Sequence, residues 1–311
     1  MAAFPGSPFG ILASASLLAG SIAFCSLTQR PPASAQVVMP TGGIAHGSLL
    51  ALPPAWTPVP SPLPSPSPSP TTLPTPEPPA ENPIIIGYSV AGRPLEVYRY
   101  GRGPVSRMLV AGIHGGYEWN TIDLVRQLMD YVEQSPEVIP PGVTLYILPA
   151  LNPDGEARAH GVLGRANDRA VDLNRNWPVH WDGEWPRGGC WSQLDITAGA
   201  YAGSEPETRA LLKFLTENVM NALINYHSAA LGIFPGGSPP DPDSARLAQA
   251  LAAVSPYPYP PIETGCLYTG TLVDWTSARG TASVDLELSN HHDTDFEINL
   301  GILSTFLSWA R

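Results

Sequence analysis

Lysine is almost absent from this chain of 311 residues, because Lys213 is its only lysine. Lys and Arg together number 16 against 27 Asp and Glu residues, so the formal net charge is −11. Proteins that bind nucleic acid gain affinity when basic side chains displace counterions from phosphates. The charge balance therefore predicts no nucleic-acid partner, and it leaves no polybasic patch for a membrane surface.

Charged residues are missing altogether from residues 9–27, an apolar segment of 19 residues. Such a segment is near the upper limit for a secretory signal and is just long enough to span a bilayer. A candidate cleavage site, Ala33-Ser34-Ala35, follows it. Cys25 suggests a lipidation site, although Phe24 before it is bulky for one. We therefore expect residues 1–35 to be an export signal, cleaved or retained as a membrane anchor, in a secreted or surface-tethered protein outside the cytoplasm.

Cysteine is scarce as well, with three residues in the whole chain. Cys25 lies in the export segment, so Cys190 and Cys266 remain for the mature protein. In an oxidising compartment two cysteines favour one disulfide. Two buried free thiols are the alternative.

Proline is concentrated in residues 51–83, which contain 14 prolines and only two charged residues, Glu77 and Glu81. Each proline fixes φ and removes a backbone donor, so this segment can neither pair as a strand nor continue a helix. We expect residues 36–83 to form a disordered, extended polyproline II linker. Such a stalk would hold a folded domain, residues 84–311, away from a membrane or wall.

Within residues 84–311, strand-like and helix-like patterns alternate. Strand-like runs cover residues 84–90, 95–100, 108–114, 143–148, 222–226 and 282–288, and helix-like runs cover 118–132, 205–219, 243–254 and 296–309. This alternation predicts an α/β fold with a mixed, largely parallel central sheet and helices on both faces. Sites in such sheets lie at the carboxyl ends of the strands, where the polar residues described next occur.

Two histidines and one glutamate follow apolar runs in a pattern typical of metal sites. His114 ends the run 108–114, and Gly115 and Gly116 permit a tight turn before Glu118. His227 ends a second apolar run further along the chain. Two imidazoles and one carboxylate form the three-ligand pattern of catalytic zinc sites, which leaves one position open. Taken singly, a histidine at a strand end is more often a hydrogen-bonded structural residue.

The middle of the chain carries more specific motifs, an Asn-Pro-Asp-Gly string at residues 152–155 and a Val-Asp-Leu-Asn-Arg-Asn-Trp string at residues 171–177. Together with His-Ser at residues 227–228, these strings resemble the zinc carboxypeptidases of the M14 family, over nearly all of residues 84–311. The resemblance implies one zinc ion per chain, bound by His114, Glu118 and His227.

The same resemblance implies roles for five further residues at matching positions. Asp172 matches the carboxylate that hydrogen-bonds a ligand histidine. Asn174 and Arg175 match the pair that grips the terminal carboxylate of the substrate, a task that suits the guanidinium fork. Arg165 resembles the arginine that polarises the scissile carbonyl, and Tyr268 matches the mobile tyrosine that caps the substrate.

Glu287 matches the general base of the family, and the strand pattern agrees with that role. Residues in a strand alternate between faces, so Glu287 and Asp285 share one side, whereas the apolar residues 284, 286 and 288 share the other. A carboxylate at this place can take a proton from water activated by the metal. The alternative is an exposed carboxylate on an edge strand.

Two features depart from the family pattern. Three residues separate His114 from Glu118, where the family has two, and we expect the two glycines to absorb the additional residue. The second feature is the crowding of His291, His292, Asp293 and Asp295 after the general base. These four could form a second metal site, but a solvated loop is the favoured interpretation.

These residues predict a monomeric metallocarboxypeptidase that removes C-terminal residues from peptides by promoted-water hydrolysis. One alternative is cleavage of the γ-D-glutamyl–diaminopimelate bond in peptidoglycan stem peptides, which suits a compact domain on a stalk. An acylase of small amino-acid derivatives and an inactive zinc-fold binding module also stay open as alternatives.

By the resemblance, Val273 falls near the side-chain pocket, where it would disfavour basic C-terminal residues. Cys190 and Cys266 both border the substrate pocket on the same grounds, so we expect them to pair.

Overall fold

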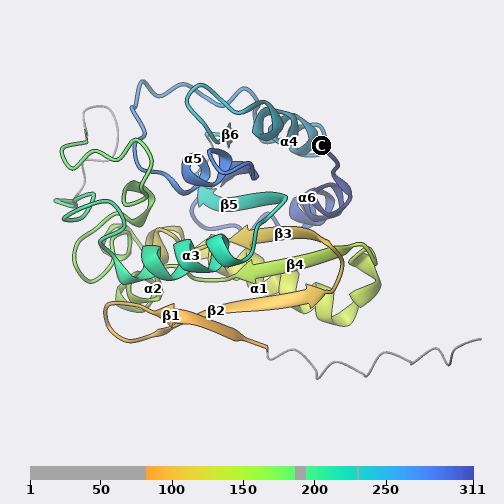
Figure 1. Cartoon of the computed structure of the whole chain (residues 1–311), viewed down its shortest axis with the longest axis horizontal. Helices are drawn as coiled ribbons and strands as arrows, with labels where there is room; N and C mark the ends of the chain where they lie inside the picture. The colour runs from red at the N-terminus through yellow and green to blue at the C-terminus, as the bar shows by residue number, and fades with distance from the viewer. Residues whose placement is uncertain (1–81, 186–193, 230) are drawn as a thin grey trace, which may run out of the picture. The chain divides into compact units, whose positions relative to one another are not determined.

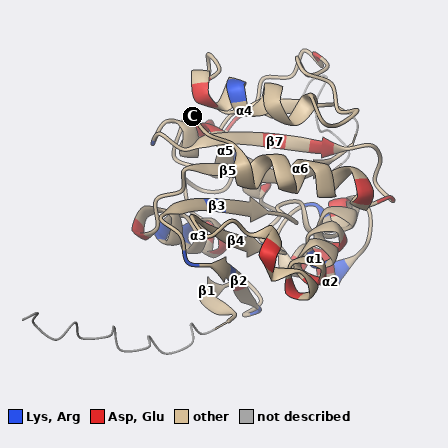
Figure 2. Ribbon diagram, turned by 90° about the vertical axis from the view of Figure 1, so that its right-hand side faces the viewer, with Lys and Arg blue, Asp and Glu red and all other residues tan. Residues whose placement is uncertain are grey.

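The computed structural model describes residues 82–185, 194–229 and 231–311. The expected export signal and the expected linker up to residue 81 lie outside the described residues. In the described part, one sheet has the strand order β1-β2-β4-β3-β5-β7-β6 (β7 is labelled in Figure 2 and the other strands in Figure 1). The strands are Ile84–Tyr88 (β1), Pro94–Gly101 (β2), Val105–Val110 (β3), Val143–Leu148 (β4), Ala222–Ser228 (β5), Ile233–Pro235 (β6) and Ala282–Leu288 (β7).

The sheet is mixed, as the sequence predicts. Its inner strands β4, β3, β5 and β7 are parallel to one another. The strands β1 and β2 at one edge and β6 at the other pair antiparallel. Parallel strands are covered on both faces and so consist of almost continuous apolar runs, and every residue of β5 is buried. The predicted α/β fold class is confirmed.

Helices cover both faces of this sheet. The α-helices of the described residues are Trp119–Gln134 (α1), Pro153–Arg158 (α2), Pro206–Glu217 (α3), Pro242–Ala252 (α4), Leu272–Ser277 (α5) and Phe296–Ser308 (α6), and the 3-10 helices are Gly115–Glu118 (η1), Pro136–Val138 (η2), Val162–Gly164 (η3) and Leu173–Arg175 (η4). Residues of α1, α4 and α6 pack into the core on one face, and residues of α3 and α5 pack on the other. Figure 2 shows α1 and α6 beside each other on the first face.

Alternation along the strands supplies both cores. In β3, Leu109 packs with α1 and α6, whereas Met108 and Val110 pack with α3 on the opposite face. β7 follows the same rule, since its apolar residues at 284, 286 and 288 all join the first core. Asp285 and Glu287 therefore emerge on the second face, beside α5. The fold thus places two carboxylates on one side of the strand.

The sequence patterns do not reveal three of the strands and α-helices. β6, α2 and α5 contain three, six and six residues, too few to display a helical or strand period. The expectation that His114 closes a strand is wrong, because β3 ends at Val110. Gly112, with φ of 60°, turns the chain away from the sheet, and His114 follows in a turn. Among the described residues, no helix has both the length and the apolarity that a membrane span needs.

Candidate metal and catalytic site

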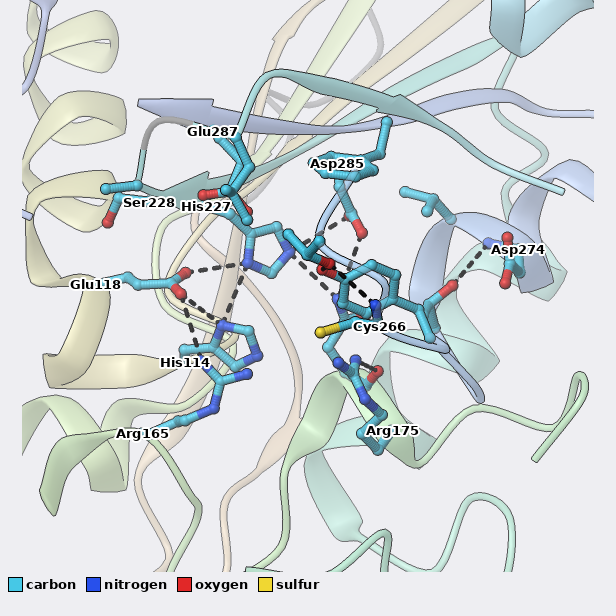
Figure 3. A pocket seen from close by; sticks show the side chains of 18 of the residues that line it. His114, Glu118, Arg165, Arg175, His227, Ser228, Cys266, Asp274, Asp285 and Glu287 are labelled. Atoms are coloured by element: carbon cyan, nitrogen blue, oxygen red, sulfur yellow. Dashed lines mark hydrogen bonds and ion pairs between the residues drawn. The ribbon is translucent and has the colours of Figure 1, made fainter. Parts of the chain in front are cut away.

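Three side chains with metal-binding atoms meet at the carboxyl end of the sheet (Figure 3). The Nδ1 atom of His114 lies 2.8 Å from Oε1 of Glu118, and Nδ1 of His227 lies 3.0 Å from Oε2 of the same carboxylate. The two Nδ1 atoms are 3.2 Å apart. All three side chains are buried. The fold therefore brings together the residues that the sequence predicts as zinc ligands, although the histidines are 113 positions apart.

The short 3-10 helix η1 sets the spacing of the first two residues. Gly115 has φ of 46°, and a Cβ atom on Gly116 would lie 2.0 Å from the carbonyl oxygen of Ala159. Any other residue type at Gly116 would collide with backbone that follows α2. The turn accommodates the additional residue between His114 and Glu118, and the glutamate still faces the histidine.

The donor atoms suit a zinc ion. Two imidazole nitrogens and one carboxylate oxygen are the usual protein ligands of a catalytic zinc. Such atoms lie about 2.0–2.1 Å from the ion, so tetrahedral corners are about 3.3 Å apart. The two Nδ1 atoms are 3.2 Å apart, close to this value, and each lies 2.8 or 3.0 Å from a different oxygen of Glu118. In the part of the chain that the structure describes, this is the one such group of His, Cys, Asp and Glu side chains.

Asp172 lies behind His114, with Oδ1 3.2 Å from the Nε2 atom of the histidine. Its Oδ2 atom accepts hydrogen bonds from Nε and Nη2 of Arg165, at 3.1 and 2.9 Å. Burial alone would raise the pKa of Asp172, but Arg165 and His114 hold it well below its ordinary value. The ionised carboxylate thus fixes both neighbours. Nη1 of Arg165 lies 3.6 Å from Oε1 of Glu118, so the guanidinium borders the metal site.

Glu287 stands beside His227, because the parallel register of β5 and β7 pairs these two residues. Its Oε2 atom is buried and has no hydrogen-bond partner among the described residues. Burial raises the pKa of this carboxyl to about 8, with His227 acting against the rise and Glu118 adding to it. A divalent cation at the triad would favour the ionised form. Beside a bound ion, Glu287 would be a carboxylate with a free oxygen.

The predicted substrate-binding residues lie in the same pocket, which has a volume of about 530 Å³. Arg175 is buried, and its Nε atom has no hydrogen-bond partner in the described part of the chain. Its guanidinium lies over the rings of Trp185 and Tyr268, at 4.8 and 5.2 Å from their centroids. Tyr268 is partly exposed at the rim, where its hydroxyl lies 3.1 Å from Oγ1 of Thr264. Asn174 also lines the pocket, beside Arg175.

Comparison with known proteins identifies the family. The model of the zinc carboxypeptidase family, the M14 peptidases, matches residues 75–299. The chain belongs to this family. Carboxypeptidase B of Astacus astacus is 29% identical over 191 residues, which are 54% of this chain and 61% of that protein. The catalytic chain of human carboxypeptidase N is 28% identical over 214 residues, 55% of this chain and 46% of that protein. The chain therefore spans less than two thirds of the length of these two relatives.

Solved structures of other proteins have the same fold. Bovine thrombin-activatable fibrinolysis inhibitor superposes with a TM-score of 0.61 at 22% identity, over 73% of this chain and 89% of that one. The murein-tripeptide amidase MpaA from Escherichia coli O157 superposes with a TM-score of 0.54 at 22% identity, over 75% of this chain and 94% of that one. At such identities the likeness establishes the fold alone.

Three further polar residues, Asn225, Asp285 and His291, lie close to the metal-binding triad. Asn225 and Asp285 lie two positions before His227 and Glu287 on their strands, so the strand period already placed them on the site face. His291 lines the pocket and its Nδ1 atom lies 3.0 Å from Oγ of Ser228. Their contacts with the ligand histidine and with Ser228 depend on the folded structure, so the sequence alone could not predict them.

The segment 291–295 contributes no second metal group among the described residues. Instead, the amides of His292 and Asp293 donate to Oδ1 of Asn290, so the segment forms a local turn.

Cys266 is disulfide-bonded and lines the pocket. Its expected partner Cys190 lies outside the described residues, so that pairing stays a prediction.

Proposed function

We propose that this protein is a zinc-dependent metallocarboxypeptidase that removes C-terminal residues from peptides. The observation that supports it most is the convergence, in one pocket, of His114, Glu118 and His227 with a base and a cation. Glu287 and Arg175 both line this pocket, and each has one buried side-chain atom, Oε2 and Nε, without a hydrogen-bond partner among the described residues. Hydrolysis of a peptide end needs both groups, one to move a proton and one to hold a carboxylate.

His114, Glu118 and His227 would hold one zinc ion per chain. When bound, zinc supplies a Lewis acid that activates water and polarises a carbonyl. Glu287 would accept the proton of the attacking water and donate it to the leaving amine. Arg165, fixed by Asp172, would stabilise the negative charge on the carbonyl oxygen. Asp172 holds the Arg165 guanidinium before substrate arrives, which is the preorganisation that such catalysis requires.

Arg175 would select the chain end of the substrate. A carboxylate can accept two parallel hydrogen bonds from a guanidinium. Arg175 lines the pocket, and its Nε atom has no hydrogen-bond partner among the described residues. Asn174 lines the pocket beside Arg175, with its NH₂ group toward His227 and Asp285. Tyr268 would close over the substrate from the rim. Val273 lines the pocket together with Asp274 and Asp285, so the side-chain subsite has apolar and acidic surroundings.

The decisive experiment compares one peptide in its free-acid and C-terminally amidated forms. The wild type should cleave the free acid much faster. In Arg175→Ala the preference should fall by about 10- to 150-fold, because a hydrogen bond to a charged group is worth roughly 1.5–3 kcal/mol. The measured quantity is the ratio of the two kcat/KM values.

Arg279→Ala is the matched control for this experiment. Arg279 also lies over an indole ring, 4.4 Å from the centroid of Trp275, but it does not line the pocket. This variant should retain the preference for the free acid. Equal cleavage of the acid and the amide by the wild type would rule out the carboxypeptidase assignment in favour of an endopeptidase or amidase.

A peptidoglycan stem-peptide amidase is the second candidate. The superposition covers 94% of the murein-tripeptide amidase chain, so nearly all of that chain has a counterpart in this domain. A panel of muropeptides assayed beside C-terminally varied peptides separates the two candidates. Release of diaminopimelate-containing products without release of ordinary C-terminal residues would select the amidase. We further propose that the enzyme is a monomer that acts outside the cytoplasm, secreted or tethered by its N-terminal segment.

A further inference from the structure

We propose that Asp285 is a positioning residue that accepts a hydrogen bond from Nε2 of His227 and thereby fixes the ring for metal binding through Nδ1. The inference rests on the proposed function, in which His227 is a metal ligand. It assigns to the second ligand histidine a carboxylate of its own, in addition to the one that Asp172 provides for His114.

The two ring nitrogens of His227 have different surroundings. Nδ1 faces Glu118 at 3.0 Å and His114 at 3.2 Å, so this nitrogen belongs to the metal site. Nε2 faces Oδ1 of Asp285 at 3.3 Å, the Nδ2 atom of Asn225 at 2.8 Å and the Nδ2 atom of Asn174 at 3.3 Å. When Nδ1 binds a metal, Nε2 carries the proton and needs an acceptor.

Both asparagines direct their NH₂ groups, which are donors, toward Nε2 of His227. Oδ1 of Asn174 accepts a hydrogen bond from the backbone amide of Leu272 at 2.9 Å, which directs the NH₂ group toward His227. Asn225 donates from Nδ2 to Oδ1 of Asp285 at 2.7 Å, so its NH₂ group also faces the carboxylate. Of the three groups around Nε2, only Asp285 offers an acceptor. The two amides hold this carboxylate in place as donors.

The strand register places Asp285 for this role. β5 and β7 are parallel neighbours, with Asn225 opposite Asp285 and His227 opposite Glu287. The histidine and its acceptor are therefore fixed by two adjacent strands of the central sheet. A rigid acceptor lowers the entropy that the ring loses when it binds metal, and its negative charge makes Nδ1 a better donor. Loss of such a contact typically costs about 10- to 100-fold in metal affinity.

The experiment measures zinc affinity by competition with a chromophoric chelator, in folded full-length protein. Asp285→Ala should bind zinc about 10- to 100-fold more weakly than the wild type. Asp285→Asn should recover part of the loss, because an amide oxygen can accept the bond but carries no charge. The absorption spectrum of the cobalt(II)-substituted protein provides a second measure, since it responds to ligand geometry. It should change in Asp285→Ala and move back toward the wild type in Asp285→Asn.

Asp274→Asn is the matched control. Asp274 lines the same pocket but bonds the backbone amide of Gly237 rather than a ligand histidine, so zinc affinity should not change. Wild-type affinity and an unaltered cobalt spectrum in Asp285→Ala would overturn the inference. If that variant does not fold, wild-type affinity in Asp285→Asn would overturn it instead. A wild-type protein that binds no zinc would contradict the proposed function, which keeps the two failures distinct.

Discussion

Asp285 and Glu287 face the same pocket from one strand, but their carboxylates are used differently. Asp285 accepts a hydrogen bond from Asn225 at 2.7 Å and lies against His227. Glu287 keeps one buried oxygen without a partner among the described residues. A general base needs a lone pair that is free to take a proton, whereas a positioning carboxylate must already be bonded. The surroundings therefore favour Glu287 over Asp285 as the proposed general base.

At the residue scale, the first prediction concerns Glu287→Gln. The amide keeps the shape of the side chain but cannot take a proton from water, so kcat should fall by at least about 10²–10⁴-fold. Zinc content and peptide affinity should stay close to those of the wild type, because Glu287 is not among the proposed ligands. Steady-state kinetics and elemental analysis of the same preparation measure both quantities. Full activity in this variant would mean that the base lies elsewhere.

At the scale of elements, the turn η1 decides where the first two ligands lie. The chain leaves β3 at Val110 and reaches Glu118 through two glycines that press against the backbone after α2. A side chain at Gly116 would force this contact apart and move the Glu118 carboxylate away from His114. The metal site therefore depends on the packing of the two glycines that precede Glu118 in this turn.

Gly116→Ala tests this dependence. Overpacking of a tight contact costs roughly 1–3 kcal/mol, so the free energy of unfolding should fall by that amount and zinc affinity should fall with it. Gly142→Ala is the control, because a Cβ atom there meets nothing within 4 Å and both quantities should be unchanged. Urea denaturation of the metal-free protein and a zinc titration provide the two measurements. Equal stability of the two variants would show that η1 tolerates a side chain.

Much of the element pattern could be predicted from sequence, since buried strands and amphipathic helices carry a period that can be counted. The same period placed Asp285 beside Glu287 on one face. The end of β3 could not be predicted, because the apolar run continues to Ile113 after the chain has left the sheet. The contact between Asp285 and His227 depends on which strands are neighbours. Strand order is a property of tertiary structure, and a single sequence does not state it.

At the scale of the whole molecule, the proposed ligands connect distant parts of the catalytic domain. His114 and Glu118 lie near one end of the domain sequence, and His227 lies on β5 in the middle of the sheet. The unfolded chain does not hold these groups together. Zinc should therefore bind the native state far more tightly than the unfolded chain and should stabilise the entire domain.

The resulting prediction concerns thermal unfolding with and without zinc. Binding to the native state alone adds about 2.7 kcal/mol when free zinc is 100 times its Kd. For a domain of this size each kcal/mol raises Tm by about 2–4 °C, so zinc should raise Tm by about 5–11 °C and a chelator should reverse the rise.

His227→Ala should lose this response, because it removes one of the three proposed ligands. His292→Ala removes an exposed histidine of the turn after β7 and should keep the response. Calorimetry of the three proteins decides the matter, since an equal zinc response in His227→Ala would place the ion at another site.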